Sequence, residues 1–237
     1  MEIKILFDSI AVDQAYSIGW GFSCLIDGHI LFDTGESYEF LFNNMNRMNI
    51  DRTKLTAIVL SHEHWDHVDG VWEIVQENKN IPVYCCPHFS LPFKDDMKKT
   101  GANALFKSTA IEIEKNIFTT GEIASLYKNH YLPEQALVLR TENGISIITG
   151  CAHPGITHII DIIKGNFPNE KMYCVLGGFH LKDKDINTIE KIVNEFRING
   201  IQKVAPAHCT GERAVEGFKK QFGEGFVSVQ VGKMVSV

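Results

Sequence analysis

One stretch of the chain carries most of its recognisable chemistry, and it reads Ser61-His62-Glu63-His64-Trp65-Asp66-His67-Val68-Asp69-Gly70. Imidazole and carboxylate groups are ligands for zinc and related divalent ions. Residues two apart do not share a helix face, so His62 and His64 can meet at one ion only from a loop. The apolar run 56–60 predicts a strand that ends just before this loop. Asp66 and His67 then open the next helix and reach a second point, which favours two ions over one structural ion or a polar surface cluster.

Three further histidines follow apolar runs that predict strands. They are His153, His180 and His208, after the runs 144–149, 172–176 and 201–205. Strand ends collect at one edge of a layered α/β fold, where sites form. We therefore expect His153 and His208 to be metal ligands. For His180 the sequence leaves two roles open, a metal ligand or a residue that contacts substrate.

Strand-like and helix-like patterns alternate along the whole chain. Strands are expected at 2–8, 22–26, 29–32, 56–60, 81–84, 110–114, 116–119, 135–141, 144–149, 172–176, 201–205 and 226–231. Helices are expected at 37–48, 68–77, 156–164, 185–198 and 212–221. Residues 86–108 have weak periodicity and are interpreted as an irregular excursion that covers the active site and contributes to specificity. The similar rhythm of the two halves favours two sheets packed face to face with helices outside.

Composition excludes several classes of protein. The 237 residues are 44% hydrophobic and 22% charged, which argues against disorder. A formal charge of −6 argues against binding to nucleic acid or anionic membrane, although a phosphorylated small-molecule substrate stays open. No stretch approaches the ~20 apolar residues of a membrane span, and the acidic N-terminus does not resemble a signal peptide. Six cysteines without a C-x-x-C pair favour a reduced, cytoplasmic setting. The oligomeric state is not indicated.

The histidine loop and four further motifs together resemble the metallo-β-lactamase-fold superfamily. The four motifs are Leu31-Phe32-Asp33-Thr34-Gly35, Gly150-Cys151-Ala152-His153-Pro154-Gly155-Ile156, Gly177-Gly178-Phe179-His180-Leu181 and His208-Cys209-Thr210-Gly211. The last three resemble a branch that includes synthases joining a dihydropterin to a ribofuranosyl-aminobenzene phosphate, together with metal-dependent hydrolases. The resemblance implies a single domain over 1–237, a four-layer αββα sandwich of two mixed β-sheets with helices on both outer faces. A dinuclear metal site would lie at one edge.

The resemblance also implies which side chains would bind each ion. One ion would be bound by His62, His64 and His153, and the other by Asp66, His67 and His208. Asp33 would hydrogen-bond one of these ligands. Without the resemblance, Asp33 reads as a turn residue making an Asx bond.

Cys151 is a departure from the superfamily pattern, because many members have an aspartate there that bridges the two ions. A thiolate is a good zinc ligand, so Cys151 is a candidate bridge or ligand. The alternative is a small buried residue, with water as the bridge. Two divalent ions are expected, zinc first, with manganese or iron as alternatives.

These residues favour a metal-dependent hydrolase that activates a bridging hydroxide against an ester, lactone, amide or phosphoester. Asp66 would orient the nucleophile, and His180 would stabilise negative charge or protonate the leaving group. Thr210-Gly211 either presents backbone N–H groups to an anion or simply caps a helix. The alternatives are condensation of the pterin/ribofuranosyl-aminobenzene phosphate synthase type, a non-catalytic metal-binding module, and a di-iron redox protein.

Overall fold

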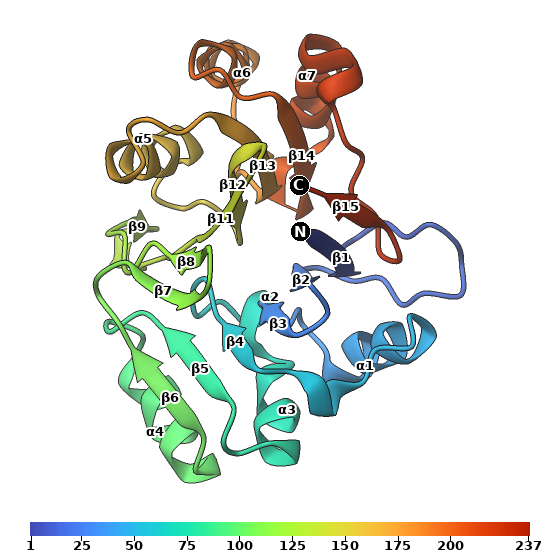
Figure 1. Cartoon of the computed structure of the whole chain (residues 1–237), viewed down its shortest axis with the longest axis vertical. Helices are drawn as coiled ribbons and strands as arrows, with labels where there is room; N and C mark the ends of the chain where they lie inside the picture. The colour runs from blue at the N-terminus through green and yellow to red at the C-terminus, as the bar shows by residue number, and fades with distance from the viewer.

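Two mixed β-sheets lie face to face in the computed structural model, which describes all 237 residues (Figure 1). The first sheet contains, in spatial order, β15 (Met234–Ser236), β1 (Glu2–Phe7), β2 (Ser23–Ile26), β3 (Ile30–Phe32), β4 (Ala57–Val59), β5 (Pro82–Cys85) and β6 (Asn103–Phe106). The second contains β14 (Lys203–Ala207), β13 (Met172–Gly178), β12 (Gly144–Thr149), β11 (Leu137–Thr141), β8 (Ile117–Thr119) and β7 (Ile111–Glu114). Both sheets mix parallel and antiparallel pairs.

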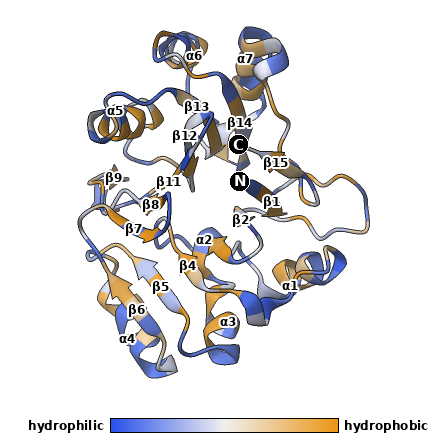
Figure 2. Cartoon of the chain, viewed as in Figure 1, coloured by the Kyte–Doolittle hydropathy of each residue, from blue (hydrophilic) through white to orange (hydrophobic).

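Helices cover the outer face of each sheet. The first sheet is covered by α1 (Tyr38–Arg47), α3 (Val71–Glu77) and α4 (Leu91–Thr100), and the second by α5 (Ile156–Asn166), α6 (Ile186–Ile198) and α7 (Glu212–Phe222). In Figure 2 these helices mix hydrophobic and hydrophilic residues, as expected for elements with one buried face. The predicted four-layer αββα architecture is confirmed. No helix is long and apolar enough to cross a bilayer.

Three apolar layers separate the four layers of secondary structure. Between the sheets lie side chains such as Ile5, Phe32 and Leu176. The residues next to these along each strand point to the outer face of their sheet. Leu31 therefore packs under the helices of the first sheet, and Ile147 packs under those of the second. Because both faces of the sheets are covered, the strands are short, nearly continuous apolar runs. This explains why the sequence runs could be recognised as strands.

Residues 86–108 are not an irregular cover, and that prediction is wrong. They form α4 and β6, which pack against β5 and the outer face of the first sheet through Phe93 and Met97. Ser90 caps the helix by accepting a hydrogen bond from the Phe93 N–H, and Gly101 ends it with a φ of 72°. Only two side chains of this helix are buried, which is why its periodicity was too weak to predict a helix.

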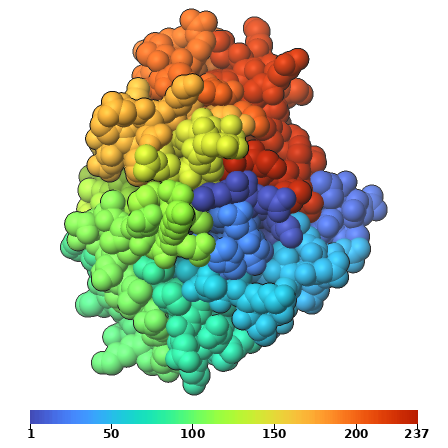
Figure 3. Space-filling view, viewed as in Figure 1, coloured from blue at the N-terminus to red at the C-terminus, as the bar shows by residue number.

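The end of the chain also differs from the prediction. Residues 226–231 make only isolated bridges, and the final strand is β15, which pairs antiparallel with β1. The Met1 amino group donates to the Val237 carbonyl at 2.9 Å, and the two ends lie against each other in the space-filling view (Figure 3). The predicted helix 68–77 is divided into α2 (Trp65–Val68) and α3. Gly70 lies between them at the start of α3, and a Cβ there would lie 2.6 Å from the Thr34 carbonyl oxygen.

Candidate metal centre

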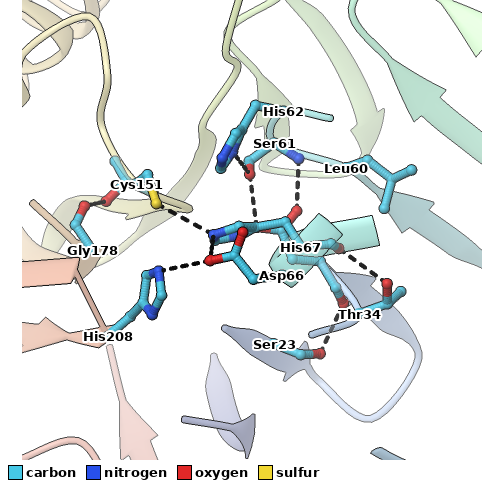
Figure 4. Close-up of polar contacts among 12 residues, drawn as sticks. Ser23, Thr34, Leu60, Ser61, His62, Asp66, His67, Cys151, Gly178 and His208 are labelled. Carbon is cyan, nitrogen blue, oxygen red and sulfur yellow. Dashed lines mark hydrogen bonds and ion pairs between the residues drawn. The ribbon is translucent and has the colours of Figure 1, made fainter. Parts of the chain in front are cut away.

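The predicted ligands come from both sheets and meet at one edge of the sandwich. The loop after β4 carries His62 and His64, and the adjoining α2 carries Asp66 and His67. The turns after β12, β13 and β14 carry the remaining candidates, which are Cys151, His153, His180 and His208. Figure 4 shows Asp66 and His67 between His62 on one side and Cys151 and His208 on the other. Side chains separated by more than a hundred residues are therefore neighbours.

The first group is His62, His64 and His153, whose donor atoms lie within 4.8 Å of one another. Burial and the neighbouring imidazoles hold the pKa of His62 well below its ordinary value, so this ring is neutral. Its Nδ1 lies 2.9 Å from the Ser61 hydroxyl, and its Nε2 is buried without a hydrogen-bond partner. A buried, neutral and unpartnered nitrogen beside two further imidazoles fits a divalent metal ion.

The second group is Asp66, His67 and His208, again within 4.8 Å. One carboxylate oxygen of Asp66 lies 3.6 Å from His67 Nε2 and 3.4 Å from His208 Nε2. Burial opposes ionisation of Asp66, but the hydrogen bond and charge of His208 and the charge of His67 lower its pKa to about 2. The His208 Nδ1 atom is buried without a partner. This carboxylate and two imidazoles are a second donor set suited to a divalent ion.

Asp33 lies behind these ligands rather than among them. Its fully buried carboxylate accepts hydrogen bonds from the Ser61 N–H, the Ser61 hydroxyl and His67 Nδ1, each at 2.7 Å. Burial alone would lower the pKa of His67, but the Asp33 charge and hydrogen bond raise it to about 9. Because Nδ1 is hydrogen-bonded to Asp33, the His67 ring presents Nε2 to the site. Metal-binding histidines are commonly oriented by a hydrogen bond of this kind.

Glu134 is a residue that the sequence analysis missed. Its buried carboxylate accepts from three successive backbone N–H groups, those of Cys151, Ala152 and His153, at 2.8–3.0 Å, and from His153 Nδ1 at 3.0 Å. Burial alone would raise the pKa of Glu134, but these hydrogen bonds lower it. Glu134 therefore orients the His153 ring through Nδ1, as Asp33 orients the His67 ring. The only signal was an acid directly before the predicted strand 135–141.

Cys151 lies between the two groups. Its Sγ atom is 3.3 Å from His67 Nε2. The sulfur also lies within 4.8 Å of donor atoms of His62 and His67 in one group, and of His153 and His180 in another. The sulfur therefore occupies the position between the candidate ion sites, where either a bridge or a ligand would stand.

A cavity of about 530 Å³ opens above these residues. One wall is a small hairpin that the sequence analysis did not predict, β9 (Leu126–Tyr127) and β10 (His130–Tyr131). The Tyr127 ring lies 5.1 Å from the rings of His64 and His153 and 5.7 Å from that of His180. The hairpin, not residues 86–108, therefore covers the site. His180, with a φ of 52°, lines the cavity beside Cys209.

The remaining predictions about single residues have different outcomes. Thr210 does not cap α7, because its hydroxyl is buried, donates to the Ala207 carbonyl at 2.7 Å and accepts from the Phe179 N–H. Gly211 occupies the cap position and lines an adjoining cavity with Arg213. The other histidines lie outside the candidate ligand groups; they are His29, His88, His130 and His158.

Comparison with known proteins agrees with this geometry. The family model of the metallo-beta-lactamase superfamily matches residues 22–169, more than half of the chain. The chain belongs to this superfamily. The match begins directly before β2 and includes Asp33, the histidine loop and His153, while His208 lies beyond it.

Individual proteins match most or all of the chain. A 7,8-dihydropterin-6-methyl-4-(beta-D-ribofuranosyl)-aminobenzene-5'-phosphate synthase of Methanocaldococcus jannaschii is 32% identical, over 89% of this chain and 85% of its own. The crystal structure of Tm1679, a metal-dependent hydrolase of the beta-lactamase superfamily, is 31% identical and superposes with a TM-score of 0.84, covering 100% of this chain and 99% of that one. Human tRNase Z, short form, covers the same shares at 11% identity and a TM-score of 0.65, which shows the fold alone.

Proposed function

We propose that this superfamily member is a metal-dependent hydrolase acting on a small, anionic ester, lactone, amide or phosphoester. The observation that carries the proposal is the pair of donor groups, His62–His64–His153 and Asp66–His67–His208, meeting beside one open cavity. Two divalent ions there, with zinc the first choice for this donor set, would supply an activated water and an electrophile. The resemblance to Tm1679, described as a metal-dependent hydrolase, supports the same reaction class.

The protein's own residues divide the remaining work. Asp66 lies at the centre of the site with an ionised carboxylate, so it can orient an attacking water while binding metal. His180 lines the cavity, and its interaction with Cys209 contributes most to raising its pKa above the ordinary value. A raised pKa keeps the proton available, which suits protonation of a leaving group or stabilisation of negative charge. Tyr127 closes the opposite side of the cavity.

Unpaired cations around the cavity support an anionic substrate. Lys128, Lys182 and Lys184 all line it, and none forms an ion pair with a carboxylate. The Lys182 ammonium lies 4.4 Å from the centre of the Trp20 ring, another lining side chain. Asp183 also lines the cavity, but the three lysines outnumber it. In a chain of net charge −6, this local excess of positive charge favours a phosphate or carboxylate group on the substrate.

Lys184→Ala is expected to reduce kcat/KM for an anionic phosphodiester, bis(p-nitrophenyl) phosphate, by about five- to tenfold, because one attractive charge is lost near the cavity mouth. For the neutral ester p-nitrophenyl acetate the same variant should change kcat/KM by less than about twofold. Lys191→Ala, on the exposed side of α6, is the matched control. Equal losses on both substrates would contradict charge recognition.

Metal uptake is expected to release protons and to weaken as the pH falls. In the metal-free protein the pKa of His67 is about 9, so at neutral pH Nε2 must lose a proton before it can bind an ion. Below pH 9, affinity for the ion bound by His67 should fall by up to about tenfold per pH unit. Calorimetry in buffers with different ionisation enthalpies measures the released protons. Asp33→Asn, which removes the charge that raises this pKa, should release fewer.

The hydrolase proposal is tested by assaying the zinc- and manganese-loaded protein against esters, lactones, amides and phosphodiesters. Turnover that disappears with a chelator and returns with metal supports the proposal. A metal-loaded protein that turns over none of these classes would overturn it. The same preparation can then be tested for condensation.

A synthase is the second candidate, favoured by one observation. The 32% identical relative is described as a synthase of a dihydropterin–ribofuranosyl-aminobenzene phosphate compound. The free lysines around the cavity would equally suit a phosphorylated substrate of that kind. Formation of a joined product from a dihydropterin and a ribofuranosyl-aminobenzene phosphate, without hydrolysis of the ester panel, would select this alternative.

A further inference from the structure

Two of the six cysteines differ from the others in their surroundings. Four thiols are packed in the apolar layers, and these are Cys24, Cys85, Cys86 and Cys174. Cys151 and Cys209 instead lie at the candidate metal centre, where both line the cavity and both are almost completely buried. All six are free thiols. The geometry of the centre places Cys151 between the two donor groups, whereas Cys209 interacts with His180 and belongs to neither group.

Cys209 is close enough to share an ion with Cys151. The two sulfurs and a ring nitrogen of His208 lie within 4.8 Å of one another, the same span as the two groups described above. The Cys209 thiol also donates to the Cys151 carbonyl oxygen at 3.5 Å, which turns it towards Cys151. A modest contraction would bring three donors of this kind, two sulfurs and an imidazole, to tetrahedral zinc distances.

The backbone around Cys209 is shaped to place its sulfur there. His208 has a φ of 44°, in the left-handed region, and it begins the short helical turn His208–Thr210 that contains Cys209. Across from it, Gly178 leaves space for the thiol. A Cβ on residue 178 would lie 2.8 Å from the Cys209 sulfur and 2.3 Å from the Gly150 carbonyl oxygen. Only glycine permits this close approach.

We propose that Cys209 is a metal-binding residue, forming with Cys151 and His208 a sulfur-rich position for a thiophilic divalent ion. The inference rests on the proposed metal centre and extends it to a residue outside the two donor groups. Thiolate ligands favour zinc, cobalt or cadmium, whereas carboxylate and water suit manganese and magnesium. The pair of sulfurs therefore makes this half of the centre selective for thiophilic ions.

Cobalt(II) reports directly on thiolate ligands, because each cobalt–sulfur bond adds near-ultraviolet charge-transfer absorption that imidazole and carboxylate ligands do not give. The full-length protein loaded with cobalt should show this band. Cys209→Ala should lose about half of its intensity, Cys151→Ala should lose a similar share, and the double variant should lose it all. In competition between zinc and excess manganese, Cys209→Ala should shift retention towards manganese by about tenfold.

Cys174→Ala is the matched control, since Cys174 is equally buried but lies between the sheets; it should keep the full band. An unchanged band in Cys209→Ala would overturn the proposal. Visible cobalt bands without any charge-transfer band would overturn the Cys209 proposal but leave the histidine–aspartate centre intact. If the protein bound no cobalt, the proposed metal centre would be overturned as well. If circular dichroism shows that Cys209→Ala is unfolded, Cys209→Ser, whose hydroxyl can still donate to the Cys151 carbonyl oxygen, gives the same readout.

Discussion

Replacing His62 by alanine is expected to remove about one bound ion per chain and to reduce turnover at least about a hundredfold. The His62 Nε2 atom is buried and unpartnered beside His64 and His153, so its loss leaves the first group with two imidazoles. The loop itself offers no third imidazole in exchange, because Asp66 and His67 lie against His208 in the second group. Elemental analysis of the dialysed protein measures the ion count.

The control for this variant is His158→Ala, which removes an exposed histidine on α5 that belongs to neither group. It should retain the metal content and activity of the parent. An unchanged ion count in His62→Ala would mean that the first group does not bind metal. His153→Ala should behave like His62→Ala, because both belong to the same group.

Glu134→Gln is expected to have the largest effect among residues that touch no ion. The glutamate accepts four hydrogen bonds in a buried position, and glutamine would place an NH₂ group against some of those N–H donors. We expect the free energy of unfolding to fall by about 2–4 kcal/mol and zinc affinity to fall by about 10–100-fold. Urea unfolding in the presence of a chelator measures the change in the free energy of unfolding without metal. Competition with a chromophoric chelator measures the change in zinc affinity.

The matched control is Glu114→Gln, which alters another histidine–glutamate pair. His29 and Glu114 are 2.8 Å apart at the surface, with half-exposed side chains. A surface pair of this kind contributes at most about 1 kcal/mol, and it lies outside the metal centre, so zinc affinity should not change. If Glu134→Gln were as mild as this control, His153 would be positioned by the backbone of its turn alone.

The histidine loop could be recognised from sequence because its candidate ligands are close along the chain. Spacing alone separates His62 and His64 from Asp66 and His67, since a strand end and a helix start point them to different places. His153 and His208 could be predicted because each follows an apolar run, and parallel strands end at the same edge. The family motifs then indicated how the candidate ligands would be grouped, and the structure places the donor atoms of each trio within 4.8 Å of one another.

Glu134, the hairpin carrying Tyr127, and α4 could not be predicted by the same reasoning. Glu134 is a single acid with no pattern around it, and its role depends on three amides that lie 17–19 residues further along the chain. The hairpin has two-residue strands, too short for an alternation to be visible. The α4 helix buries only Phe93 and Met97, so its apolar face is narrow.

Hydrophobic periodicity and the spacing of candidate ligands are local properties of the chain, so the layered fold and most of the side chains at its edge could be predicted from them. The orientation of those side chains and their surroundings depend on contacts between distant segments. The buried carboxylates of Asp33 and Glu134 fix two imidazole rings, and Gly178 leaves space for the Cys209 sulfur beside Cys151. Hydrogen bonds and close packing of this kind join residues that are distant in sequence, so they exist only once the two sheets have packed together.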